Sequence, residues 1–109
     1  MRLTIEDLVA RGACRGAQQW FQHYFPDGVD VTMEALGSLS PGVLQNMASG
    51  WTAWLVEFCL PHDRALGYFS DKSFDERLGA WAWPWEQYNR TALRQFIELA
   101  EGLTEWKKP

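Results

Sequence analysis

Proline and glycine divide this 109-residue chain into short segments, and this punctuation constrains the fold more than any other feature. Glycines at positions 12, 28, 37 and 102 and prolines at positions 26, 41, 61 and 84 flank stretches whose apolar residues recur with helical spacing. Glycine commonly terminates helices and proline commonly opens them, so each stretch is predicted to form a separate helix. The expected fold is all-α: a compact orthogonal bundle of five to seven short helices, with little or no strand, in one domain over residues 1–109.

Caps and apolar spacing place the helices of the first half. Thr4 and Asp7 resemble a capping box that opens a helix ending at Gly12, and residues 13–25 carry one aromatic stripe typical of a core helix. Thr32 caps a short helical turn, while a two-residue β contact at residues 29–31 remains open. Residues 41–60 are predicted as one helix, the longest, in which Gly50 allows a neighbouring helix to approach closely.

The second half shows three more helical segments. Residues 62–69 are predicted as a short helix with Leu66 and Phe69 facing inward. A capping box at residues 73–76 opens a helix toward residue 81, and Pro84 starts the last helix, which ends at Gly102. Residues 104–109 are expected to fray.

Composition limits the class of protein. With 47% hydrophobic and 15% aromatic residues, the chain has enough apolar surface for a core. Its apolar runs, such as AWLV at residues 53–56, are far shorter than the roughly 18–20 residues of a membrane span. The N-terminus turns acidic where a signal peptide would be apolar, so the expectation is a cytoplasmic protein with no membrane partner.

No motif for catalysis, metal binding or cofactor binding emerges, so the chain is predicted not to be an enzyme and to need no metal or cofactor. Cys14 and Cys59 stand 45 positions apart without a CxxC motif and are expected to be buried free thiols. Pairing of either cysteine with His23 or His62 would be needed for nucleophilic catalysis, which leaves a small thiol enzyme as a minor hypothesis.

The negative charge is concentrated in the middle of the chain. Net charge is −4, and no Lys or Arg occurs between Arg15 and Arg64. That stretch holds five acidic residues: Asp27, Asp30, Glu34, Glu57 and Asp63. This distribution argues against direct binding of nucleic acid, which needs clustered cations, and favours a protein partner with a basic surface. An ordinary solvated acidic surface is the alternative.

The segment WAWPW at residues 81–85 is the feature that folding explains least. Alternate residues do not share one helical face, so at least one of Trp81, Trp83 and Trp85 is expected to be partly exposed. Exposed tryptophan is a common binding anchor. The alternative is that all three rings fold back over an open end of the bundle.

Two segments resemble small helical accessory proteins encoded by phages and prophages: GACRGAQQWF at residues 12–21, with a tryptophan six positions after the cysteine, and WTAWL at residues 51–55. The resemblance covers residues 12–60. Those proteins have no assigned catalytic activity, so no functional residue is carried over. The resemblance implies a short acidic inhibitor of a host enzyme, as anti-CRISPR proteins are.

The sequence therefore predicts a non-enzymatic inhibitor that binds a basic, nucleic-acid-handling host protein, such as a CRISPR effector subunit. The predicted partner-binding residues are Asp27, Asp30 and Glu34 for the electrostatic part and Trp83 and Trp85 for the apolar part. The alternative is a structural or assembly protein that self-associates through exposed aromatic residues.

Overall fold

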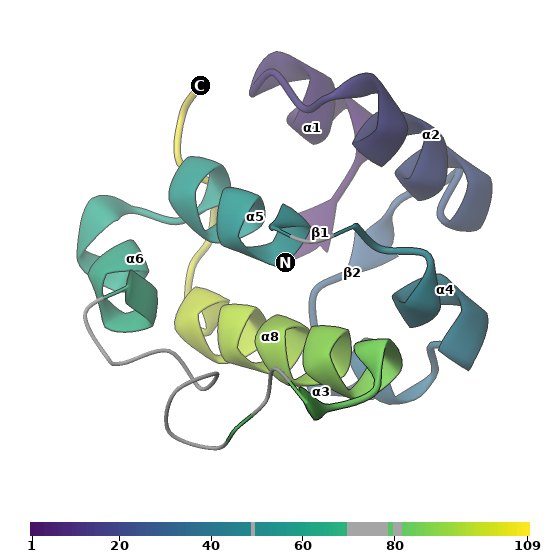
Figure 1. Ribbon diagram of the computed structural model, residues 1–109. Helices are drawn as coiled ribbons and strands as arrows, with labels where there is room; N and C mark the ends of the chain where they lie inside the picture. The colour runs from purple at the N-terminus through teal and green to yellow at the C-terminus, as the bar shows by residue number, and fades with distance from the viewer. Residues whose placement is uncertain (49, 70–78, 80–81) are drawn as a thin grey trace.

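The computed structural model describes residues 1–48, 50–69, 79 and 82–109. These residues are mainly helical, as predicted, but the fold is not strictly all-α because two short strands pair (Figure 1). The elements are β1 (Arg2–Leu3), α1 (Ile5–Ala10), α2 (Arg15–Tyr24), β2 (Val29–Asp30), α3 (Met33–Gly37), α4 (Pro41–Gln45), α5 (Trp51–Cys59), α6 (His62–Phe69) and α8 (Trp85–Ala100). The helix predicted from residue 73 toward residue 81 lies outside the described residues.

The two strands form an antiparallel pair in which Arg2 lies opposite Asp30 and Leu3 opposite Val29. Gly28 makes this pairing possible, because its φ of +88° is a conformation that favours glycine. A Cβ there would also lie only 3.0 Å from the carbonyl oxygen of Leu3. The β contact that the sequence left open therefore forms, and it brings the N-terminus against the middle of the chain.

Helix α8 is the element around which the others pack. It contacts α3, α4, α5 and α6 and runs across the lower half of Figure 1. Its buried residues are Asn89, Ala92, Phe96 and Ala100, which the helical repeat aligns along one side. Arg64 on α6 donates hydrogen bonds to the carbonyl oxygens of Leu99 and Glu101, at 3.0 and 2.7 Å, which satisfies acceptors at the helix end.

The long helix predicted over residues 41–60 is wrong: the structure has two helices, α4 and α5, with a break between them. The first helix ends at Gln45, and Gly50 sets the start of the second, because its φ of +85° is left-handed and places it at the N-cap of α5 rather than inside a helix. A Cβ on Gly50 would meet nothing within 4 Å, so this glycine does not serve close helix packing.

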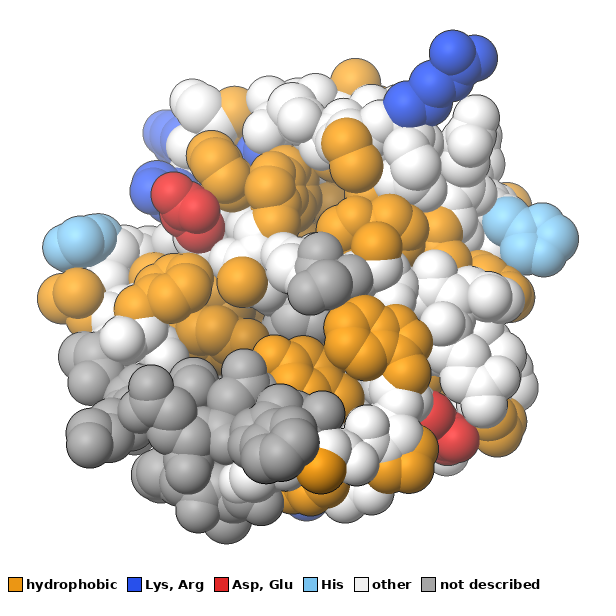
Figure 2. Space-filling model, in the orientation of Figure 1, with side chains coloured by type: hydrophobic (Ala, Val, Ile, Leu, Met, Phe, Trp, Pro, Cys, Tyr) orange, Lys and Arg blue, Asp and Glu red, His pale blue; other side chains and the backbone are white. Residues whose placement is uncertain are grey.

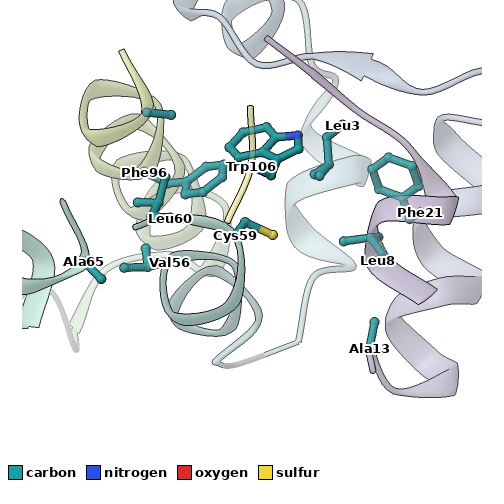
Figure 3. Packing of buried hydrophobic residues seen from close by; sticks show 11 residues of the cluster. Leu3, Leu8, Ala13, Phe21, Val56, Cys59, Leu60, Ala65, Phe96 and Trp106 are labelled. Carbon is teal, nitrogen blue, oxygen red and sulfur yellow. The ribbon is translucent and has the colours of Figure 1, made fainter. Parts of the chain in front are cut away.

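Residues 104–109 were predicted to fray, but in the structure they are held by contacts with the core. Trp106 is only 8% exposed and lies with Phe96 and Cys59 in the core cluster of Figure 3. Its ring is parallel to that of Phe96, with 5.8 Å between centroids, and its Nε1 donates to the carbonyl oxygen of Arg2 at 2.8 Å. The backbone N–H of Lys107 also donates to the carbonyl oxygen of Cys59 at 2.8 Å. Trp106 therefore holds the last segment against the core, although the residues on either side of it are exposed.

Three residues that were predicted to be buried are exposed. On α6, Leu66 and Phe69 are 49% and 52% exposed, and Ala65 faces the core instead. Cys14 is exposed, whereas Cys59 is buried; both are free thiols as predicted. Cys14 stands at the N-cap of α2 rather than within an apolar helix face, which explains its exposure.

Candidate functional site

The predicted apolar anchors lie at the start of α8, beside α4. Trp85 is 38% exposed, yet its ring is held at two points. Its Nε1 donates to the carbonyl oxygen of Met47 at 2.6 Å, and its ring stacks on Tyr88 with 5.4 Å between centroids. Trp83 is half-buried and packs against Ala92. Trp81 lies outside the described residues.

The fixed position of the Trp85 ring follows from how α4 ends. The last carbonyl groups of a helix have no partner within it, and α8 supplies donors to them. Asn89, one turn after Trp85, is buried and donates from Nδ2 to the carbonyl oxygen of Leu44 at 2.7 Å. Trp85 and Asn89 thus fix the α4 end from the same face of α8, and this contact sets the orientation of the indole.

The three predicted acidic residues are all exposed, and two of them surround a cation. Arg2 forms an ion pair with Asp30 at 2.8 Å and donates to the carbonyl oxygen of Asp27 at 2.6 Å. Glu34 lies on α3, which packs on α8. Sequence reasoning missed Arg2 because it is 28 positions from Asp30 and meets it only through the strand pair.

The other two acidic residues of the central block lie on different elements. Glu57 is exposed on α5 and Asp63 is exposed on α6. The five carboxylates thus extend over four parts of the fold: the segment before and within β2, then α3, α5 and α6. Among the described residues only Asp27, through its backbone carbonyl, and Asp30, through its carboxylate, contact the same cation, Arg2, which lowers the net negative charge of their surface.

A large apolar cavity is the feature that sequence reasoning did not find. It has a volume of about 320 Å³ and lies between the α1–α2 pair and the inner sides of α3, α5 and α8. Leu8 and Phe21 line it from one side and Leu36 and Phe96 from the other, while exposed Cys14 stands at its edge. On the face shown in Figure 2, hydrophobic side chains gather around a hollow. No local pattern marks this cavity, because it is a space between elements that are distant in sequence.

The size of the cavity matters energetically. Enclosed empty space in a protein core costs about 24 cal/mol per Å³, so 320 Å³ left fully enclosed and empty would cost about 8 kcal/mol as an upper bound. Typical domains have a total stability of about 5–15 kcal/mol. Because the cavity is open to solvent on one side, water can occupy it, and the actual cost lies below this bound.

Three tryptophans of the cavity lining differ in how their indole N–H groups are used. Trp20 donates to the carbonyl oxygen of Val43 at 3.1 Å, and its ring lies 5.6 Å from that of Trp51 between centroids. Within the described part of the chain, the indole N–H groups of Trp51 and Trp54 have no hydrogen-bond partner. Neither nitrogen is a buried atom without a partner, so solvent reaches both N–H groups.

The thiols do not form the pair that a thiol enzyme would need. Burial raises the pKa of Cys59 to about 11, the opposite of the shift that activates a nucleophile. Cys14 is exposed, and among the described residues no hydrogen bond joins either cysteine to His23 or His62. The described residues also hold no cluster of three or more His, Cys, Asp or Glu side chains able to bind a metal ion.

Among the described residues, no helix has the length and apolar composition of a membrane span. No protein family matches this chain, and no curated protein or solved structure is significantly similar to it.

Proposed function

We propose that this protein is a non-enzymatic inhibitor that binds a basic, nucleic-acid-handling host protein of the kind that anti-CRISPR proteins block. The single observation that carries the proposal is that the indole of Trp85 is 38% exposed to solvent and is nevertheless fixed by a hydrogen bond and a stacked ring. Side chains that are flexible in the free protein lose entropy on binding, and this one is already ordered.

The energetic expectation follows from this order. Tryptophan is among the residues most enriched at binding hot spots, where truncation to alanine costs about 2 kcal/mol or more. Neither the N–H bond to Met47 nor the stack on Tyr88 has to form during association. Burial of this ring by a partner therefore stabilises the complex with little loss of entropy, which lowers the dissociation rate.

The acidic residues support the choice of a basic partner. Asp27, Asp30 and Glu34 are exposed, and their charges exceed that of Arg2, the cation that contacts this segment. Such a surface attracts a cationic groove from solution and accelerates encounter, with an effect that salt reduces. A host protein that handles nucleic acid offers a groove of this kind, and occupying it would inhibit the host protein.

The experiment is a pull-down from host lysate followed by affinity measurement on the captured partner. Trp85→Ala is expected to weaken binding by at least about thirtyfold, the equivalent of 2 kcal/mol, through a higher dissociation rate. Asp30→Lys with Glu34→Lys should slow association. Glu98→Lys with Glu105→Lys is the matched control, because it makes the same change in net charge at exposed positions outside the central block. Unchanged capture by the Asp30 and Glu34 double variant would rule out the acidic component.

Self-association is a second candidate function, and a separate observation favours it. Phe58 on α5 and Leu66 on α6 are both exposed, although the two helices contact each other. Exposed large apolar residues on adjacent elements are typical of surfaces that another protein covers. Light scattering distinguishes the two functions. Assembly is favoured over inhibition if the protein forms a stable oligomer that dissociates in the Leu66→Asp variant and persists in the Trp85→Ala variant.

A further inference from the structure

The apolar cavity has the properties of a small-molecule site. Its volume of about 320 Å³ is roughly twice that of the apolar cavity that stays dry and binds benzene in another protein, about 150 Å³. We propose that the cavity binds a neutral, largely apolar small molecule of roughly 10–15 non-hydrogen atoms that carries a hydrogen-bond acceptor oxygen. This site is separate from Trp83 and Trp85, which do not line the cavity.

The lining favours a small molecule over a segment of a partner protein. The cavity reaches Phe21, Met47 and Phe96, each only 2% exposed, so it extends to the centre of the helical packing. A peptide segment placed there would bury backbone N–H and C=O groups against carbon atoms, and unpaired buried backbone groups are strongly disfavoured. A compact molecule with few polar atoms avoids this cost.

The charges around the cavity favour a neutral molecule. No Lys, Arg or His is among the described residues that line it. Asp30 is the one charged residue of that described lining, and its carboxylate is already paired with Arg2 at 2.8 Å. A carboxylate or phosphate group on the ligand would find no counter-ion and would lose its hydration.

The acceptor oxygen of the proposed ligand is assigned from two indole donors that the described residues leave unused. Trp51 and Trp54 both line the cavity, and their N–H groups have no partner among the described residues. Trp20, by contrast, has its N–H satisfied by Val43. Donors with no acceptor on the protein match the carbonyl or ether oxygen of an ester or a ketone.

The test uses two neutral probes, methyl nonanoate and 4-phenyl-2-butanone, with nonanoate as the charged match of the first. Binding to the full-length protein is measured by isothermal titration calorimetry, and the indole N–H signals of Trp51 and Trp54 are followed by NMR. We expect saturable one-to-one binding of at least one neutral probe, with shifts of those indole signals. At pH 7 nonanoate is expected to bind at least about tenfold more weakly than its ester.

Variants locate the site. Ala17→Phe places a ring in the cavity from α2 and is expected to weaken probe binding by at least about tenfold. Ala35→Leu does the same from α3 and serves if Ala17→Phe fails to fold. Ala10→Phe is the matched control, because Ala10 is exposed on α1 and does not line the cavity. A bound probe should also slow alkylation of Cys14 at the cavity edge by N-ethylmaleimide.

Three results would overturn the proposal. The first is that neither neutral probe binds saturably, including the case in which light scattering shows a dimer that covers the cavity. The second is equal affinity for nonanoate and its ester. The third is full affinity retained in folded Ala17→Phe and Ala35→Leu proteins.

Discussion

Replacement of Trp106 by alanine is the sharpest test of how this fold is held together. The indole is 8% exposed, stacks on Phe96 and donates to the carbonyl oxygen of Arg2, so one side chain joins the C-terminal segment, α8 and β1. Removing a buried Trp or Phe side chain from a core costs about 3–5 kcal/mol, which includes the cavity left behind. We expect Trp106→Ala to lower the free energy of unfolding by about 4 kcal/mol.

Urea unfolding followed by far-UV circular dichroism measures this loss. With a slope of about 1.5 kcal/mol per molar urea, a loss of 4 kcal/mol lowers the midpoint by about 2–3 M at unchanged slope. Trp106→Phe keeps a ring against Phe96 but loses the bond to Arg2, so its expected cost is smaller, about 1–2 kcal/mol. Lys108→Ala is the surface control and should remain within about 0.5 kcal/mol of the parent protein.

The result that would refute this reasoning is a midpoint for Trp106→Ala within about 0.5 M of the parent protein. Such a result would mean that the C-terminal segment contributes no net stability. The backbone bond from Lys107 to Cys59 and the bonds from Arg11 to the carbonyl of Lys107 would then be too weak to order it.

Four further predictions concern other parts of the protein. Thr52→Val should raise the free energy of unfolding by about 1 kcal/mol, because the Oγ1 of Thr52 is buried and has no partner among the described residues. A lower free energy of unfolding would mean that this oxygen is satisfied. Gly50→Ala should cost about 1–2 kcal/mol through its left-handed φ alone, since the space is open, and an unchanged midpoint would contradict this. Burial raises the pKa of Cys59 from 9.0 to about 11, so the thiol of the unfolded protein ionises at lower pH than that of the folded protein. The free energy of unfolding therefore falls as pH rises through this window, by about 2–3 kcal/mol in total. The Cys59→Ala protein should not show this fall across the same pH range. In the folded protein below pH 9, N-ethylmaleimide should modify Cys14 rapidly and Cys59 slowly. Mass spectrometry of partly reacted protein measures the two rates, and equal rates would contradict the burial of Cys59.

The amino-acid sequence determined the features that depend on residues a few positions apart. The capping box of Thr4 and Asp7 and the cap at Thr32 form as predicted, because each side chain bonds a backbone N–H three residues away. The helices over residues 13–25 and 62–69 also appear at the expected places, with shorter bounds for the first. Their apolar spacing and flanking glycine or proline are local signals that need no tertiary partner.

Tertiary structure decided the rest, since these features depend on contacts between residues far apart in the chain. Helical spacing continues through residues 41–60, but the chain breaks between Gln45 and Trp51, and the two helices that result, α4 and α5, each pack against α8. Trp106 stands alone among polar residues, and its burial depends on a carbonyl group 104 positions away. The pairing of Arg2 with Asp30 and the apolar cavity have the same origin. Periodicity tells which face of a helix is apolar, and only the assembled helices determine what covers that face and what space remains between them.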